Sequence, residues 1–116
     1  MYTLMALPTY RIAGLLVRPG DILGRKNPGS AIWHHALLGF CNTIAHSPGP
    51  GDVFRFGVLQ EILTPGARLR VVSPTTSTAE TRRRIVRAGR LLGVSWWHMN
   101  CWQTATFIAG FPPWRG

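Results

Sequence analysis

The chain has 116 residues, of which 46% are apolar, so it can bury one small core but is too short for a (β/α)₈ barrel or a two-domain dinucleotide enzyme. It carries 13 lysines and arginines against 4 aspartates and glutamates, a formal net charge of +9. This balance favours anionic partners, such as lipid head groups, nucleic acid or anionic cell-wall polymer, and argues against mechanisms built on paired carboxylates.

The N-terminal segment does not have the pattern of an export signal. Pro8 and Arg11 interrupt its apolar stretch, and no basic segment precedes it. No run approaches the roughly 18 apolar residues that a membrane-spanning helix needs. We therefore expect a cytoplasmic protein, without a signal peptide or transmembrane segment, that can bind peripherally to an anionic membrane.

Pro-Gly pairs divide the first two-thirds of the chain into short apolar runs. Each pair marks a turn, and the runs between the turns have the length of β-strands. The strand at 10–17 could equally be a short helix, and Gly57 could interrupt the run around it. The predicted strands are Asp21–Arg25, Ile32–Phe40, Thr43–His46, Val53–Leu63 and Arg68–Val72.

The segment 78–92 is predicted to be an amphipathic helix. Ser77 and Glu80 have the spacing of a capping box at its start, and Gly93 ends it. Apolar residues recur at i, i+3 and i+7, which gives one apolar stripe. The stripe consists of Ile85, Ala88 and Leu92.

Arginines cover the rest of this predicted helix. They could simply form a solvated helix exterior, or they could form an anion-binding patch, which the shortage of nearby acids supports. The arginines are Arg82, Arg83, Arg84, Arg87 and Arg90.

A second, buried helix is predicted to begin after Asn100. Asparagine is a preferred N-cap residue, and Gln103 completes a capping box. The segment 101–109 is almost entirely apolar, and Gly110 ends it. With strands first and helices last, the chain is predicted to be a single α+β domain over 1–116, a small antiparallel sheet packed on helices.

Cys101 is the strongest candidate nucleophile. It is the first residue of the predicted second helix, where unpaired amides and the helix dipole stabilise a thiolate. A buried structural cysteine is the alternative. Cys41 lies in a connection between strands with no helix after it, so we interpret it as structural. Two cysteines are too few for a disulfide framework and lack zinc-ligand spacing, so we expect no metal and no cofactor.

Histidines could supply the base that a cysteine nucleophile needs. His34 and His35 are adjacent in a predicted strand and so point to opposite faces. His46 lies twelve residues after His34, on a hairpin partner, where its ring could come beside that of His34. Cys101, His34 and His46 would then form a nucleophile, a base and an orienting group. A core histidine bonded to the backbone is the alternative for either strand histidine, and His98 is expected to face solvent.

Three tryptophans lie close to Cys101 in the sequence, and two interpretations of them stay open. Trp96, Trp97 and Trp102 could form a hydrophobic slot for a substrate chain, or they could close the small core, which is the simpler interpretation.

The order of these motifs resembles the lecithin retinol acyltransferase family. Here Pro19-Gly20-Asp21 precedes His34-His35-Ala36-Leu37, His46 follows, and Asn100-Cys101 opens an apolar helix. In the family the order is P-G-D, then H-W-A-L, a second histidine about twelve residues on, and N-C-E-H-F. His35 therefore replaces a tryptophan, and Trp102-Gln103 replaces Glu-His.

The resemblance, which covers about residues 19–110, implies a fold and a mechanism. The fold is the circularly permuted papain-like fold shared with NlpC-type cell-wall peptidases. In the mechanism, Cys101 forms an acyl-enzyme, His34 is the general base, favoured over His35, and His46 orients His34. Asn100 caps the helix, and the backbone amide of Cys101 binds the oxyanion.

Three classes of function follow from these features. The first is a thiol hydrolase or acyltransferase that acts on acyl substrates, with lipid esters as one class. The second is a papain-like peptidase or amidase that cleaves peptide or cell-wall bonds. The third is a catalytically idle basic binding module, for which nucleic acid is a weaker candidate partner because no recognised motif accompanies the charge.

Overall fold

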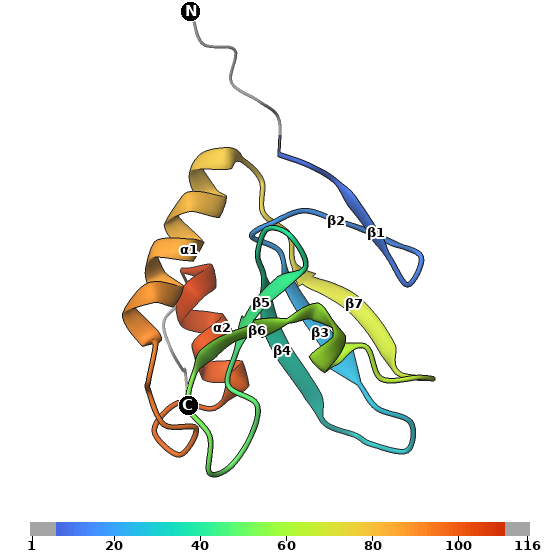
Figure 1. Cartoon of the computed structure of the whole chain (residues 1–116), viewed down its shortest axis with the longest axis vertical. Helices are drawn as coiled ribbons and strands as arrows, with labels where there is room; N and C mark the ends of the chain where they lie inside the picture. The colour runs from blue at the N-terminus through green and yellow to red at the C-terminus, as the bar shows by residue number, and fades with distance from the viewer. Residues whose placement is uncertain (1–6, 111–116) are drawn as a thin grey trace, which may run out of the picture.

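A computed structural model of the chain describes residues 7–110 as an α+β fold, which confirms the predicted class (Figure 1). Five antiparallel strands form the main sheet in the order β6-β5-β4-β3-β7, and a separate hairpin pairs β1 with β2. Among these residues, neither helix is long and apolar enough to cross a membrane. The elements are β1 Tyr10–Ile12, β2 Leu15–Val17, β3 Ile22–Lys26, β4 Trp33–Leu38, β5 Thr43–His46, β6 Arg55–Val58, the 3₁₀ helix η1 Leu59–Ile62, β7 Arg68–Ser73, α1 Thr78–Leu91 and α2 Cys101–Ala109.

Side-chain alternation along the strands divides the interior into two cores. Ile22 and Leu37 face the helices and pack with residues of α1 and α2, whereas Leu23 and Leu38 face the other way. The hairpin and η1 contribute Val17 and other side chains to that second core. Both faces of the sheet are therefore covered, and residues on successive strand positions have different neighbours.

Two predicted strands take a different form in the structure. The ambiguous segment 10–17 is a tight hairpin, with Ala13 and Gly14 at positive φ in its turn. The run Val53–Leu63 is not one strand, because β6 ends at Val58 and the chain turns into η1. The Glu61 carboxylate accepts a hydrogen bond from the Val58 amide at 2.8 Å, which stabilises this turn.

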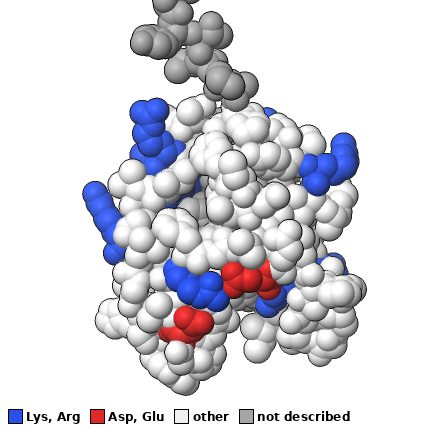
Figure 2. Space-filling view, in the orientation of Figure 1, with Lys and Arg blue, Asp and Glu red and all other residues white. Residues whose placement is uncertain are grey.

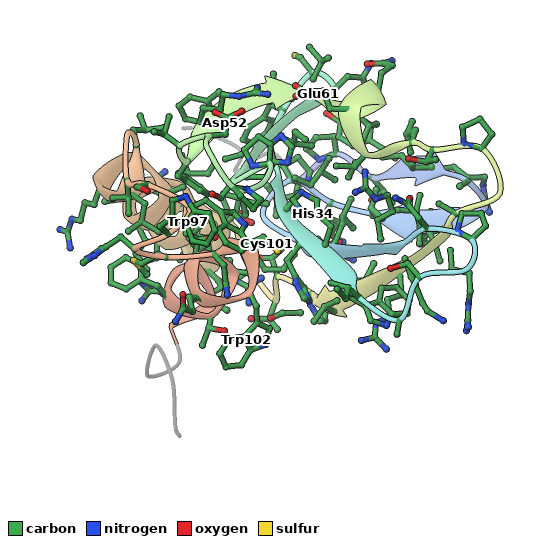
Figure 3. The ribbon with its side chains drawn as sticks, turned by 90° about the horizontal axis from the view of Figure 1, so that it is seen from below. His34, Asp52, Glu61, Trp97, Cys101 and Trp102 are labelled. Carbon is green, nitrogen blue, oxygen red and sulfur yellow. The ribbon has the colours of Figure 1, made fainter. Side chains whose placement is uncertain are left out.

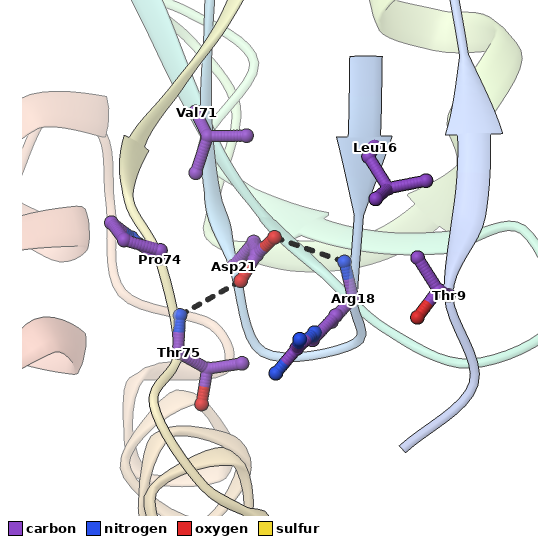
Figure 4. A pocket seen from close by; sticks show the side chains of 7 residues that line it. All are labelled: Thr9, Leu16, Arg18, Asp21, Val71, Pro74 and Thr75. Carbon is purple, nitrogen blue, oxygen red and sulfur yellow. Dashed lines mark hydrogen bonds between the residues drawn. The ribbon is translucent and has the colours of Figure 1, made fainter. Parts of the chain in front are cut away.

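The Pro19-Gly20-Asp21 corner has a structural role (Figure 4). Asp21 is buried and accepts hydrogen bonds from the amides of Arg18, at 2.9 Å, and Thr75, at 2.8 Å, so both carboxylate oxygens bind main chain. Gly20 has a φ of +100°, and a β-carbon there would lie 2.6 Å from the Thr81 hydroxyl. The corner thus joins β2, β3 and the start of α1. A cavity of about 360 Å³ beside Asp21 is lined by neither Cys101 nor a histidine.

Helix α1 begins as predicted, and its predicted stripe is confirmed at Ala88, with Ile85 packed against the core, but not at Leu92. Ser77 caps it by accepting a hydrogen bond from the Glu80 amide. Leu91, rather than the predicted Leu92, belongs to the core, because the helix ends at Leu91 and Leu92 is 45% exposed. Thr81, Arg84 and Ala88 are its other buried residues.

The predicted arginine patch on α1 was wrong to include Arg84. This side chain is buried and donates hydrogen bonds to the carbonyl oxygens of Gly20 and Ser73, while its Nε contacts Glu80 at 3.0 Å. Arg87 donates to the Ile108 carbonyl, and Arg83 pairs with Glu80. The patch is thereby reduced to Arg82 and Arg90, which are exposed and make no ion pair with any residue of 7–110. On the face in Figure 2, the cations are scattered, some at the edges and some beside the acidic residues, rather than in one continuous area.

Candidate active site

Cys101 lies at the start of α2, as the sequence predicts. The Asn100 side chain accepts a hydrogen bond from the Gln103 amide, and the Gln103 side chain accepts one from the Asn100 amide, so the capping box is complete. Pairing between β4 and β5 involves only Leu37 and Leu38 on β4, which leaves the first half of β4 unpaired on that side. Residues of α2 pack against β4, and the cysteine is half-buried there.

Burial outweighs the groups that favour a Cys101 thiolate. Backbone N–H groups of His35, Trp102 and Cys101 itself point to the sulfur, and the Arg25 guanidinium is nearby, as expected for a helix start. Desolvation is the larger effect, so the pKa of the Cys101 thiol lies above its ordinary value of 9.0. The predicted amide stabilisation is present, but the resting group is the neutral thiol.

His34 and His46 are in direct contact. His34 Nε2 and His46 Nδ1 are 2.7 Å apart, and the rings meet edge to face with centroids 5.0 Å apart. Desolvation, followed by the nearby His46, lowers the pKa of His34 to about 3. Desolvation also lowers the pKa of His46, although Glu61 partly opposes that change. Both rings are therefore neutral at pH 7.

One cavity brings the candidate nucleophile and base together. Its volume is about 230 Å³, and Cys101, His34, Arg25 and Trp96 are among its lining residues. In Figure 3, His34 on β4 and Cys101 at the start of α2 lie next to each other. No direct hydrogen bond joins the sulfur to His34 in the described chain, so the cavity supplies the shared space in which a substrate carbonyl could reach both.

His35 lies outside this arrangement. Its side chain is 8% exposed and lines a different cavity, of about 60 Å³, with Trp102 and Ala105. Its Nδ1 is buried without a hydrogen-bond partner in residues 7–110. Strand alternation thus directs His35 under α2 and His34 toward His46, in accord with the choice of His34 as base.

No protein-family model, curated protein or solved structure matches this chain. The function is therefore inferred from the chemistry of the residues around the cavity that Cys101 and His34 line.

Glu61 is a site residue that the sequence does not reveal. Its Oε1 lies 3.4 Å from His46 Nε2 and 2.8 Å from an Arg55 nitrogen. The hairpin pairs Arg55 with His46 in register, and η1 then returns the chain so that Glu61 reaches both. Because the 53–63 run was expected to continue as a strand, no sequence pattern placed this carboxylate beside a histidine. The site is therefore not built from thiol and imidazole alone.

Arg25 is a second residue of the site that the sequence does not reveal. Its Nη1 donates a hydrogen bond to the Glu61 carbonyl oxygen at 3.3 Å, and its side chain lines the Cys101 cavity. Desolvation lowers the pKa of Arg25, and the negative charge of a Cys101 thiolate opposes this change. A cation next to the thiol and both histidines favours negative charge in the cavity.

Two of the tryptophans do not close the core, contrary to the simpler interpretation. Trp97 is 73% exposed and Trp102 is 48% exposed, whereas Trp96 is half-buried and lines the Cys101 cavity. Ile32, which is 78% exposed, lines the same cavity. Exposed apolar side chains therefore lie near the cavity that holds the thiol.

His98 is exposed, as predicted, and Cys41, interpreted from the sequence as structural, is exposed as well. Cys41 lies in the turn between β4 and β5 with a φ of 55°, a left-handed conformation that asparagine tolerates well. An exposed second thiol reacts with cysteine reagents, so experiments on Cys101 need a Cys41→Asn background.

The protonation states predict how the Cys101 thiol titrates. Because its pKa is raised, deprotonation should be half complete only above pH 9, and the neutral His34 cannot hold a thiolate as an ion pair at pH 7. Thiolate absorbance near 240 nm, measured as Cys41→Asn minus Cys41→Asn/Cys101→Ala, should thus be absent at pH 7 and rise above pH 9. A thiolate signal already complete at pH 6 would show a resting ion pair and contradict this assignment.

Proposed function

We propose that the protein is a cysteine-dependent acyl-transfer enzyme, a thiol hydrolase or acyltransferase that works through an acyl-enzyme. The observation that carries this proposal is the shared cavity of Cys101 and His34, with His34 bonded to His46 at 2.7 Å. A nucleophile, a base and a group that orients the base are the three elements such chemistry needs. The circularly permuted papain-like fold is part of the proposal, supported by the order of histidine-bearing strands before a cysteine-bearing helix.

The Cys101 thiol and the His34 ring both begin the acylation step in their neutral forms. His34 takes the proton from the Cys101 sulfur as the sulfur attacks the substrate carbonyl carbon, which becomes tetrahedral and carries the negative charge on its oxygen. The Cys101 backbone amide, at the start of α2, donates to that oxygen, and Arg25 adds positive charge nearby. His34 then returns the proton to the leaving group as the thioester forms.

Deacylation reverses the proton transfers. A water molecule, an alcohol or an amine attacks the thioester carbonyl while His34 takes its proton, and Cys101 recovers that proton as the thiolate leaves. Water gives a hydrolase and the other acceptors give an acyltransferase. The open cavity admits either type of acceptor.

Lipid esters are the substrate class that the surface favours. Ile32 exposes apolar area at the cavity of Cys101, Trp97 and Trp102 are exposed at neighbouring positions of the chain, and the net charge of +9 attracts an anionic membrane. Aromatic side chains of this kind suit the boundary between lipid and water. A membrane-bound ester would then meet the thiol at a partly apolar surface of a protein whose net charge is positive.

A substrate comparison tests this proposal. We expect turnover of p-nitrophenyl esters in the Cys41→Asn protein, increasing with acyl length and with anionic vesicles, and at least about 10³-fold lower in Cys41→Asn/Cys101→Ala. Cleavage of peptide anilides with no ester turnover would instead indicate a peptidase or amidase. Vesicle or nucleic-acid binding that survives Cys101→Ala, without turnover of any substrate, would indicate an idle binding module.

A further inference from the structure

The contacts of the two site histidines continue beyond them to a carboxylate. His34 Nε2 meets His46 Nδ1 at 2.7 Å, and His46 Nε2 meets Glu61 Oε1 at 3.4 Å. The second contact is an ion-pair distance rather than a formed hydrogen bond, and His46 Nε2 has no hydrogen-bond partner in the described structure. Glu61 is thus the acceptor that this buried nitrogen faces.

Glu61 is held as an anion in a fixed position. An Arg55 nitrogen lies 2.8 Å from Oε1, and the Val58 amide donates to Oε2 at 2.8 Å. The hydrogen bonds from Arg55, first, and then from Val58 lower the pKa of Glu61 to about 2. At any pH at which the protein is expected to work, this side chain is a carboxylate that can only accept.

The Glu61 carboxylate is an acceptor at one end of the series of contacts from His34 through His46. It therefore determines which imidazole nitrogens carry protons. A bare His46 Nε2 would oppose a carboxylate oxygen, so this nitrogen carries the proton in the neutral ring. His46 Nδ1 is then the bare nitrogen and accepts from His34 Nε2–H. His34 Nδ1 is left unprotonated, and it is the nitrogen able to take a proton from a thiol in the shared cavity.

We propose that Glu61 is a positioning residue for the acyl-transfer reaction: its carboxylate fixes both histidines as Nε2–H tautomers and leaves His34 Nδ1 free to receive the Cys101 proton. This inference rests on the proposed function.

Glu61 also stabilises the positive charge that forms on His34 during the reaction. When His34 takes the thiol proton it becomes a cation in surroundings that already contain Arg25 and Arg55. Glu61 is the carboxylate in contact with the histidine pair, and it offsets this charge through His46. Asp52 contacts Arg55 at 3.7 Å but does not contact His46, so it provides a matched comparison.

Nuclear magnetic resonance of the imidazole nitrogens tests the tautomers directly. In ¹⁵N-labelled Cys41→Asn protein at pH 7, we expect His34 and His46 both as neutral Nε2–H rings. In Glu61→Gln, His46 should become a mixture of tautomers, and Asp52→Asn should leave both rings unchanged. A protonated Nδ1 on either ring of the parent protein would overturn the inference, whether or not the protein turns over any ester.

Kinetics supply the second readout. Glu61→Gln should lower kcat for p-nitrophenyl esters about 10- to 100-fold with little change in KM, and Glu61→Asp should recover part of the loss. Asp52→Asn should retain the kcat of the parent. Unchanged kcat and tautomers in a folded Glu61→Gln protein would reject the role of Glu61 but leave the acyl-enzyme proposal intact. Failure of Cys101 to be acylated in the parent would reject the proposed function itself.

Discussion

Replacing His34 by glutamine should slow acylation of Cys101 by about 10³-fold at pH 7. The thiol is neutral in the resting protein because burial raises its pKa, so attack on a carbonyl needs a base that removes the proton at the same time. Glutamine keeps the size and polarity of the side chain but cannot accept and return a proton. The first-order rate of acylation by a p-nitrophenyl ester in a Cys41→Asn background measures this effect.

His98→Gln is the matched control for this substitution. His98 is exposed in the loop before α2, close to Cys101 in sequence but outside its cavity, so its loss should change the acylation rate less than twofold. The rate of the His34 variant should rise as pH approaches the raised pKa of the thiol, because hydroxide then replaces the missing base. Equal acylation rates for the two variants at pH 7 would eliminate His34 as the general base.

Replacing Arg84 by methionine should lower the free energy of unfolding by about 3 kcal/mol. The buried guanidinium donates to the carbonyl oxygens of Gly20 and Ser73 and pairs with Glu80, so it joins α1 to the corner after β2 and to the end of β7. Methionine fills similar space but leaves those carbonyl oxygens buried without donors. Urea denaturation followed by circular dichroism gives the change.

Arg82→Met provides the comparison for the stability measurement. Arg82 is on the same helix but is exposed, so this change should alter the free energy of unfolding by less than about 0.5 kcal/mol. If both variants unfold at the same urea concentration, the contacts of Arg84 do not stabilise the fold as described.

Local signals were sufficient to place Cys101 at a helix start and to bring His34 and His46 together. Helix α2 begins where the capping residues Asn100 and Gln103 predict, because both hydrogen bonds of that box lie within four residues. The contact between His34 and His46 follows from a short hairpin, in which strand direction and side-chain alternation fix which side chains share a face. These features depend on few residues and little on the rest of the fold.

The residues that the sequence did not place depend on contacts between distant segments. Arg84 was assigned to a solvated or anion-binding face because its partners, Gly20 and Ser73, come from other elements. Glu61 reaches His46 only because β6 ends early and η1 turns back, which a run of strand-forming residues does not indicate. The simpler interpretation of Trp97 was that it closes the core, although it is 73% exposed. For Arg84 and Glu61, tertiary contacts overrode the local pattern.

The mass of the intact protein after brief reaction with a p-nitrophenyl ester shows whether Cys101 is an activated nucleophile. We expect that Cys41→Asn gains the mass of one acyl group, that peptide mapping places this group on Cys101, and that Cys41→Asn/Cys101→Ala gains none. Dilution into hydroxylamine should remove the group, as expected for a thioester. Absence of an acyl adduct on Cys101, or equal slow acylation of Cys101 and Cys41 in the unsubstituted protein, would contradict the assignment of Cys101 as an activated nucleophile.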